Sequence, residues 1–289
     1  MKSLFLSLFL ISFSFTQVFS SYDYVGSKAT AMSGAVTSGS GGSWSMFHNP
    51  AQLADLSGIH FVNGYSRIYN LDFLPYYNMG ISYNSYSVSF QKLSTEINDT
   101  ELSSETTLSV SKGINIYKDN QSTLQSGIRF NLYQYELGQS SGMEGDGSSG
   151  SSLGSGSTIG LDIGFQGNLH EKYYIAYYLQ NINSPIIGQG LGNALPKSIS
   201  IGLSYRPYDD LLTSLDFNQL SGHMDSEIRF GMEYMIMDNL ILRTGIQTSP
   251  NRFSAGFLYN VFKTDIAYSF ITHHIMPTTH QLSIGFRFK

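Results

Sequence analysis

Residues 281–288 read Gln-Leu-Ser-Ile-Gly-Phe-Arg-Phe and show most clearly the pattern from which the fold is predicted. Successive side chains of a β-strand point to opposite faces, so the stretch separates into two sets. One face is apolar throughout and consists of Leu282, Ile284, Phe286 and Phe288. The other face is small or polar and consists of Gln281, Ser283, Gly285 and Arg287. This pattern is typical of a strand with lipid on one side and water on the other.

The same alternation recurs from Gly58 onward, in runs of about ten residues separated by turn residues. It predicts about fourteen strands, at approximately 59–68, 76–83, 86–95, 104–117, 121–136, 156–167, 172–181, 196–206, 210–220, 226–236, 239–248, 251–260, 262–272 and 279–288. A soluble β-sandwich would bury the apolar face equally well, but its outer face would carry many Lys and Glu side chains. The polar faces here are small and weakly charged, so a membrane barrel is favoured.

The composition supports the same fold class. Charged residues make up 13% of the chain, against about 25% in ordinary soluble domains, and aromatic residues make up 14%. A surface of this kind suits a wall between lipid and an aqueous lumen. We therefore predict an all-β protein, a transmembrane antiparallel β-barrel of about 14 strands with an N-terminal hatch segment inside the lumen.

The N-terminus has the features of a secretory signal peptide. Lys2 is followed by a mostly apolar core from Leu4 to Phe15 and by a small-residue cleavage site at Val18-Phe19-Ser20. This core is shorter than the ~20 residues that a membrane-spanning helix needs. The chain contains no cysteine, which excludes disulfides, thiolate metal sites and a lipid-anchoring cysteine. Membrane attachment must therefore come from the barrel itself.

The lengths of the connections predict an orientation. Those after even-numbered strands are short, such as Asn84-Ser85, whereas most of those after odd-numbered strands are longer, up to 138–157. Bacterial barrels have short periplasmic turns and longer outer loops. We therefore expect the protein in the bacterial cell outer membrane, in contact with outer-membrane lipid, with both chain ends in the periplasm.

The chain is predicted to divide into three parts: a signal peptide at 1–20, a hatch at 21–57 and the barrel at 58–289. The middle part does not alternate and is rich in Gly, Ala and Ser. Barrels of about eight strands fill their own lumen with side chains, and those of about sixteen leave a channel. About fourteen strands leave a space that the middle part can occupy.

The predicted hatch carries a family resemblance. Its short motifs are Gly26-Ser27-Lys28-Ala29, Met32-Ser33-Gly34-Ala35 and Asn49-Pro50-Ala51-Gln52-Leu53. They resemble the N-terminal signature of the FadL-like outer-membrane superfamily, especially its PorV/PorQ branch. We take the hatch motif to be Gly26, Met32, Gly34, Asn49, Pro50 and Ala51. A structural turn at Asn49-Pro50 is favoured over direct ligand contact, since Asn side chains bond nearby backbone and Pro fixes its own φ.

The resemblance implies one of two functions. The first is an accessory or scaffold role in type IX-like protein secretion, with secretion-system proteins as partners. The second is FadL-like transport of hydrophobic small molecules. The modest loops of a chain of 289 residues favour the first, because they leave little room for an elaborate outer ligand-binding domain. A transporter would instead have an apolar mouth, for which the sequence offers Tyr69, Leu71, Phe73, Leu74, Ile186 and Ile187.

Several charged residues fall on the polar faces of predicted strands. They are Asp216, Arg229, Glu233, Arg243 and Arg287. A charge facing lipid would cost about 2 to 4 kcal/mol near the bilayer centre, so these side chains are expected to point into the lumen. We expect Arg229, Glu233 and Arg243 to pair with one another or with Asp216. An ion-pair network that braces the wall or holds the hatch is favoured over a substrate path.

The sequence gives little sign of enzyme chemistry. Its seven histidines have no spacing typical of metal ligands, and a catalytic nucleophile cannot be recognised without geometry. A formal charge of -5 without long basic runs argues against a nucleic-acid partner. We therefore expect a non-enzymatic protein without a metal or cofactor.

Overall fold

The structure, a computed structural model, describes residues 22–97, 100–140, 150–188, 193–221 and 226–288. The predicted signal peptide lies outside these residues. None of the described helices is long and apolar enough to cross a membrane. The described chain consists mainly of strands, as the alternation predicts.

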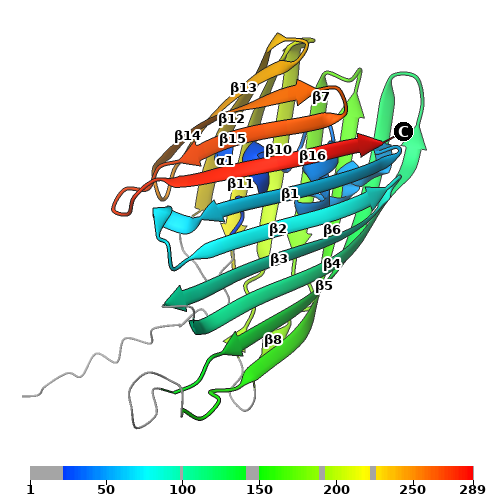
Figure 1. The fold of residues 1–289 in the computed structure, drawn as a ribbon. Coiled ribbons are helices and arrows are strands. Elements are labelled where there is room, and N and C mark those ends of the chain that lie inside the picture. The colour runs from blue at the N-terminus through cyan, green and yellow to red at the C-terminus, as the bar shows by residue number, and fades with distance from the viewer. Residues whose placement is uncertain (1–21, 98–99, 141–149, 189–192, 222–225, 289) are drawn as a thin grey trace, which may run out of the picture.

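Fourteen strands form a closed antiparallel barrel, which confirms the predicted fold class (Figure 1). They are β1 (Ile59–Arg67), β2 (Pro75–Tyr83), β3 (Tyr86–Ile97), β4 (Thr100–Lys118), β5 (Ser122–Leu137), β6 (Ser155–Leu169), β7 (Tyr173–Gln180), β10 (Ser198–Tyr208), β11 (Leu211–Leu220), β12 (Ser226–Met237), β13 (Leu240–Gln247), β14 (Arg252–Val261), β15 (Thr264–Ile271) and β16 (Thr279–Phe288). The first and last strands pair from Ile59–Phe288 to Arg67–His280. Closure therefore leaves no strand edge at the seam between the chain ends.

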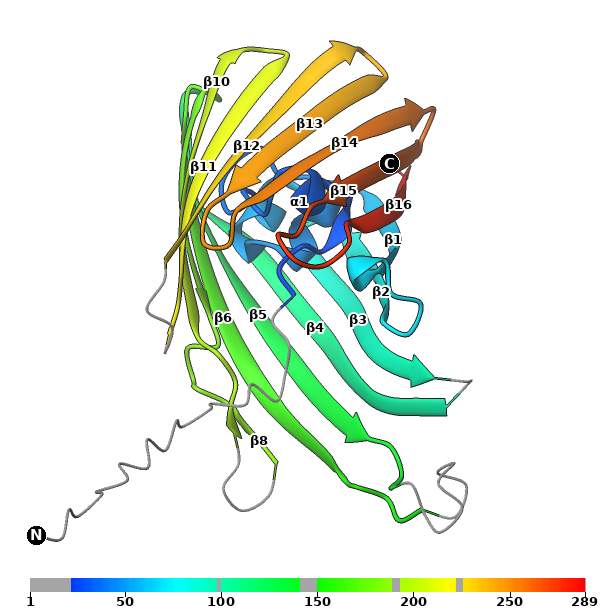
Figure 2. The same cartoon turned by 90° about the vertical axis from the view of Figure 1, so that its left-hand side faces the viewer.

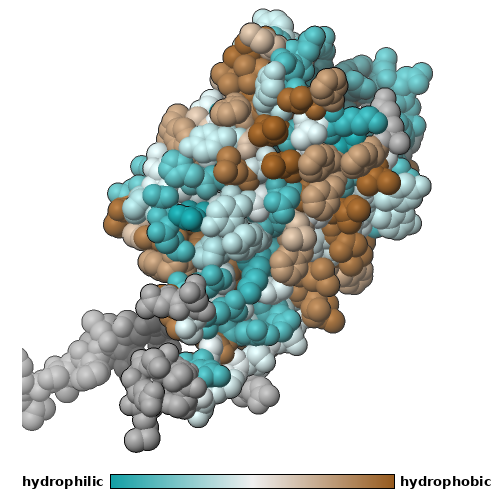
Figure 3. All heavy atoms as spheres, viewed as in Figure 1, coloured by the Kyte–Doolittle hydropathy of each residue, from teal (hydrophilic) through white to brown (hydrophobic). Residues whose placement is uncertain are grey.

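The two faces of the strands differ as the alternation predicts. In β16, Leu282 and Ile284 are 57% and 43% exposed on the outside, whereas Gln281 and Ser283 are buried on the lumen side. Figure 3 shows many hydrophobic side chains on the outside of the wall, which lipid would cover. The wall near the outer ends of β3 and β4 is more hydrophilic in the same view.

Strands β4, β5 and β6 extend beyond the rest of the barrel at the end that carries the long connections (Figure 2). A two-stranded sheet of β8 (Ile186–Ile187) and β9 (Asn193–Ala194) lies beside this extension. We call this the long-loop end, and the end with the short turns, where Ile59 and Phe288 lie, the short-turn end.

The hatch, defined here as residues 22–57, lies inside the barrel (Figure 2). It contains α1 (Gly26–Ala31) and two 3₁₀ helices, η1 (Ser43–Phe47) and η2 (Pro50–Asp55). A third 3₁₀ turn, η3 (Ile68–Asn70), follows β1. Helix α1 packs against β14 to β16, and η2 packs against β4 to β6. The hatch thus spans the lumen from one side of the wall to the other.

The described start of the hatch corrects the expectation that both chain ends lie at the short-turn side. The Tyr22 ring lies 5.0 Å from that of Tyr76, at the long-loop end of β2. The barrel strands do begin and end together at the short-turn end. The hatch therefore runs through the lumen from the long-loop end before β1 begins, a path that strand periodicity cannot show.

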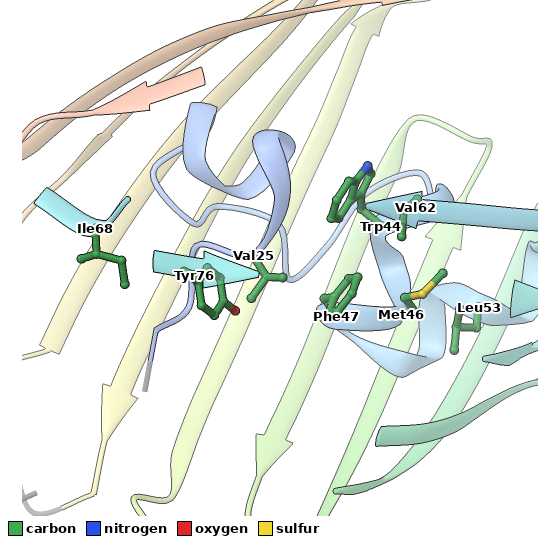
Figure 4. Close-up of a cluster of buried hydrophobic side chains, with 8 residues drawn as sticks. All are labelled: Val25, Trp44, Met46, Phe47, Leu53, Val62, Ile68 and Tyr76. Atoms are coloured by element: carbon green, nitrogen blue, oxygen red, sulfur yellow. The ribbon is translucent and has the colours of Figure 1, made fainter. Parts of the chain in front are cut away.

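An apolar cluster joins the hatch to the wall (Figure 4). It consists of Val25, Trp44, Met46, Phe47, Leu53, Val62, Ile68 and Tyr76. The first five belong to the hatch and the others to β1, η3 and β2. Burial of these side chains is the main apolar contribution to hatch docking, at about 25 cal/mol for each Å² removed from water.

Candidate functional site

Glycines on the lumen face of the wall allow the hatch backbone to come close. A Cβ atom on Gly127 would lie 2.2 Å from the carbonyl carbon of Pro50. The same obstruction exists at Gly113, which faces the backbone of Leu53 and Ala54, and at Gly245, which faces Met32. The small residues that the alternation places inside the barrel are therefore explained by contact with the hatch.

The glycines of the hatch motif have both steric and backbone roles. Gly26 and Gly34 have φ values of +82° and +80°, which disfavour any residue with a side chain. A Cβ on Gly26 would also lie 2.3 Å from Cε3 of Trp44, and one on Gly34 would lie 2.7 Å from Nη1 of Arg229. Met32, between them, is almost fully buried. The motif thus sets the path of the hatch backbone.

Asn49, Pro50 and Ala51 begin η2. The Asn49 side-chain oxygen accepts a hydrogen bond from the Ala51 N–H at 3.0 Å, as an N-cap does, and Pro50 is the first helical residue. The Asn49 amide nitrogen donates to the carbonyl oxygens of Thr37 and Phe165. The Asn49 side chain is fully buried and joins two parts of the hatch to strand β6.

Arg129 of β5 is the barrel residue with the most hydrogen bonds to the hatch backbone that we find in the described chain. Its guanidinium donates to the carbonyl oxygens of Met46 at 2.7 Å, Phe47 at 3.2 Å and His48 at 2.6 Å. Asp162 of β6 lies 3.8 Å away and balances the charge. A planar fork of five donors is suited to several acceptors at once.

Arg129 is not among the lumen charges predicted from the strand pattern. A usable signal existed, because Arg129 precedes the outward Phe130 on a predicted strand and so had to face inward. What the strand pattern could not show is that its acceptors would be hatch carbonyls more than 80 residues earlier in the chain.

The charged residues selected from the sequence lie on the lumen side of the wall, and one of the expected pairs, Glu233 with Arg243, is present. Glu233 and Arg243 form a pair at 2.6 Å, and Lys28 of the hatch lies 3.7 Å from the same carboxylate. Arg287 pairs with Asp265 at 2.8 Å near the short-turn end.

The expected pairing of Arg229 with Asp216 is wrong. They are directly opposed on β12 and β11, yet Arg229 pairs with Asp23 and Glu227, at 2.9 Å and 2.5 Å. Asp216 instead accepts a hydrogen bond from the Thr37 N–H at 2.8 Å. Asp23 and Thr37 belong to the hatch, whereas Glu227 belongs to β12, so these charges hold the hatch as well as the wall.

The six residues predicted to form an apolar mouth do not come together. Tyr69 and Leu74 pack on the cluster of Figure 4, whereas Ile187 packs with Tyr133 and Leu195 in a separate cluster. The remaining three are half-buried or exposed: Leu71, Phe73 and Ile186. The connection after β1 and the connection after β7 lie over different parts of the wall. Their apolar side chains therefore do not form one mouth.

The lumen instead contains a cavity on each side of the hatch. The outer cavity, toward the long-loop end, has a volume of about 120 Å³. Its apolar lining includes Val25, Val36, Phe47 and Leu195, and its polar lining includes Thr107, Arg129, Asn131, His48 and Ser200. The inner cavity, toward the short-turn end, has a volume of about 400 Å³ and includes Lys28, Val36, Trp44, His48, Glu233 and Arg243 in its lining.

His48 lies in the hatch between these cavities. Burial lowers the pKa of its imidazole from 6.5 to about 3, and the cationic Lys28 and Arg129 act in the same direction. The ring is therefore neutral at physiological pH and bonds to the Val25 carbonyl oxygen at 3.0 Å. Among the described residues, no group of His, Asp and Glu side chains is arranged to hold a metal ion.

Comparisons with known proteins address the fold. No protein-family model matches the chain, and no curated protein sequence matches it. Among solved structures, the Pseudomonas putida toluene transporter TodX is similar with a TM-score of 0.60 at 12% identity, over 93% of this chain and 98% of that one. A deletion mutant described as a TodX monoaromatic hydrocarbon channel has a TM-score of 0.60 at 11% identity, over 91% and 99%.

A FadL homologue from Pseudomonas aeruginosa aligns over 91% of this chain and 98% of that one, with a TM-score of 0.49 and 10% identity. None of these three is a PorV or PorQ protein, so that branch remains a prediction. At such low identity the likeness concerns the fold alone. The chain has a closed fourteen-stranded β-barrel whose fold is similar to that of TodX.

Proposed function

We propose that this protein carries small, mainly apolar molecules across the outer membrane. The observation that carries the proposal is the outer cavity, which lies inside the barrel between the wall and the hatch. The fold likeness to the toluene transporter TodX supports the same class of cargo. The proposal therefore adopts the second of the two functions that the sequence resemblance implies.

The size and lining of the outer cavity limit its ligand. An engineered apolar cavity of about 150 Å³ binds benzene, so about 120 Å³ suits a single small ring or a short chain. Val25, Phe47 and Leu195 provide apolar contacts, while Asp23, Arg129, Asp162 and Arg229 place charged groups in the same lining. We therefore propose a ligand with an apolar body and polar groups that can bond to this lining.

The role in protein secretion remains a prediction of the PorV/PorQ resemblance. A scaffold for protein partners needs exposed docking surfaces but no enclosed cavity. The cavity therefore supports transport, and no catalytic group is proposed within it.

The single tryptophan of the chain offers a direct binding test. The Trp44 ring lies 5.6 Å from that of Phe47, which lines the outer cavity. We expect toluene or phenol to change Trp44 emission saturably in the purified protein, whereas a disaccharide should not.

A matched pair of variants locates the site. Ser200→Phe places a ring on the lumen face of β10, in the lining of the outer cavity, and should abolish the emission change. Ile201→Phe places the same ring on the adjacent lipid face and should leave it intact. Equal responses of both variants, or no saturable response of the unaltered protein, would contradict the proposal.

A further inference from the structure

Three lysine or arginine side chains lie on the lipid face of the described strands: Arg67, Lys92 and Lys112. Arg67 pairs with Asp72 and Lys92 pairs with Glu101, both toward the long-loop end. Lys112 of β4 lies toward the short-turn end, and no carboxylate among the described residues forms an ion pair with it. It is therefore a cation on the outside of the wall whose charge the described protein does not balance.

The strand alternation directs Lys112 outward. Val110 and Ile114, its neighbours on the same face of β4, are 52% and 50% exposed, whereas Ser111 between them is buried. The Lys112 ammonium lies 4.7 Å from the centre of the ring of Tyr86, which is exposed on β3. The face of the ring attracts the cation but carries no net charge. An ammonium has three N–H donors, which remain available to an acceptor from the membrane.

Lys112 lies at a step in the short-turn rim of the wall. It pairs with Tyr86, the first residue of β3, and the N–H of the next residue, Gly113, donates to the carbonyl oxygen of Ser85 in the β2–β3 turn at 2.9 Å. Strand β4 continues beyond this turn to Lys118 and pairs there with β5 alone. The strands β2 to β5 lie side by side in Figure 1. The turn marks where the wall ends on the β3 side, so the ammonium lies within reach of lipid head groups.

An apolar row lies next to Lys112, toward the middle of the wall. Val88, Val110 and Phe130 pair with one another across β3, β4 and β5, and all three are exposed on the lipid face. A lipid with its head group at Lys112 would lay its acyl chains against this row. The ammonium, the ring and the row thus match the two ends of one amphipathic molecule.

The charge of Lys112 selects the chemistry of that head group. A lysine on the lipid face of a barrel is unfavourable to a degree that grows with its depth. A phosphate oxygen neutralises the ammonium and accepts a short, charge-assisted hydrogen bond from it. The short turns of bacterial barrels face the periplasm, where the leaflet consists of phospholipids. A phospholipid phosphate therefore supplies the negative group that the described protein lacks.

We propose that Lys112 and Tyr86 bind the phosphate group of a phospholipid in the periplasmic leaflet, with its acyl chains along Val88, Val110 and Phe130. The site lies outside the barrel, so it is independent of the proposed transport function.

Native mass spectrometry tests the site, with phosphatidylglycerol titrated into the folded protein in an uncharged detergent. Lys112→Gln should weaken binding of this lipid about fivefold, which is the effect of one basic residue near an anionic lipid surface. Lys112→Arg should keep the affinity, because it keeps the charge. Lys92→Gln is the matched control: it removes another lysine of the lipid face, but one whose partner is Glu101, and should bind as the unaltered protein does. Heat-modifiable mobility on gels verifies that each barrel is folded.

A second lipid tests the phosphate without any variant. A diacylglycerol with the same acyl chains lacks the phosphate and should bind the unaltered protein about fivefold more weakly than phosphatidylglycerol does. Equal affinities for the two lipids would overturn the proposal, and so would equal losses in Lys112→Gln and Lys92→Gln. Lipopolysaccharide that binds through Lys112 more tightly than phosphatidylglycerol would overturn the assignment to the periplasmic leaflet.

Discussion

Replacement of Arg129 by Ala should release the middle of the hatch while the barrel stays closed. Arg129 is 4% exposed and supplies hydrogen bonds to three consecutive hatch carbonyls, those of Met46, Phe47 and His48. Alanine keeps the strand intact but leaves these acceptors and the buried Asp162 without their cation.

The size of the effect follows from these contacts. Removing one partner of a buried hydrogen bond costs about 1 to 3 kcal/mol. For three carbonyls, the loss of docking free energy therefore lies between about 3 and 9 kcal/mol. The outer cavity adjoins the site and lets water replace part of the guanidinium. We therefore expect the low end, about 3 kcal/mol, which corresponds to a factor of roughly 150 in the equilibrium between docked and undocked hatch.

Hydrogen exchange measured by mass spectrometry provides the assay. Peptides from η1 and η2 should lose protection in Arg129→Ala, and emission from Trp44 should move to longer wavelength as its ring meets water. Peptides from β16 should stay protected. Arg129→Lys should give an intermediate loss, because a single ammonium cannot reach all three carbonyls in the fork geometry.

A matched arginine controls for loss of charge. Arg287 also faces the lumen, but it pairs with Asp265 and Asn260 of the wall and makes no hydrogen bond to the hatch in the described structure. Arg287→Ala should leave hatch exchange unchanged. Unaltered hatch protection in Arg129→Ala, or equal losses in both variants, would refute the assignment of Arg129 as the main hatch clamp.

Three further predictions concern the glycines of the lumen face, His48 and the lipid face of β16. Gly127→Ala should displace η2 and expose Trp44, because the added Cβ meets hatch backbone, whereas Gly285→Ala should be tolerated, since its nearest neighbour would be 3.5 Å away; emission spectra of the two variants decide this. Hatch docking should weaken as pH falls from about 6.5 toward 3, because the undocked His48 ring takes up a proton that the buried ring resists, and His48→Asn should remove this dependence of Trp44 emission on pH. Ile284→Lys should lower barrel stability in bilayers by about 2 to 4 kcal/mol in urea titrations, because it places a charge in lipid, whereas Ile284→Val should not.

The barrel could be predicted from local patterns in the sequence. Alternation with a period of two is a local property of each strand, so the lipid and lumen faces of β16 could be assigned from residues 281–288 alone. The strand count followed from the spacing of such runs, and closure followed from the need to pair every strand edge in lipid. The inward direction of Arg229 and Glu233 followed from the cost of the opposite direction.

How the lumen is used depends on the tertiary structure. Arg129 binds three hatch carbonyls and Asp216 binds the Thr37 N–H, and both contacts join segments that are far apart in the chain. The hatch has no periodic pattern, so its path, its entry from the long-loop end and its choice of partners come from the packing of unlike surfaces. Such contacts depend on which groups the closed wall brings within reach, and a single strand carries no information about them.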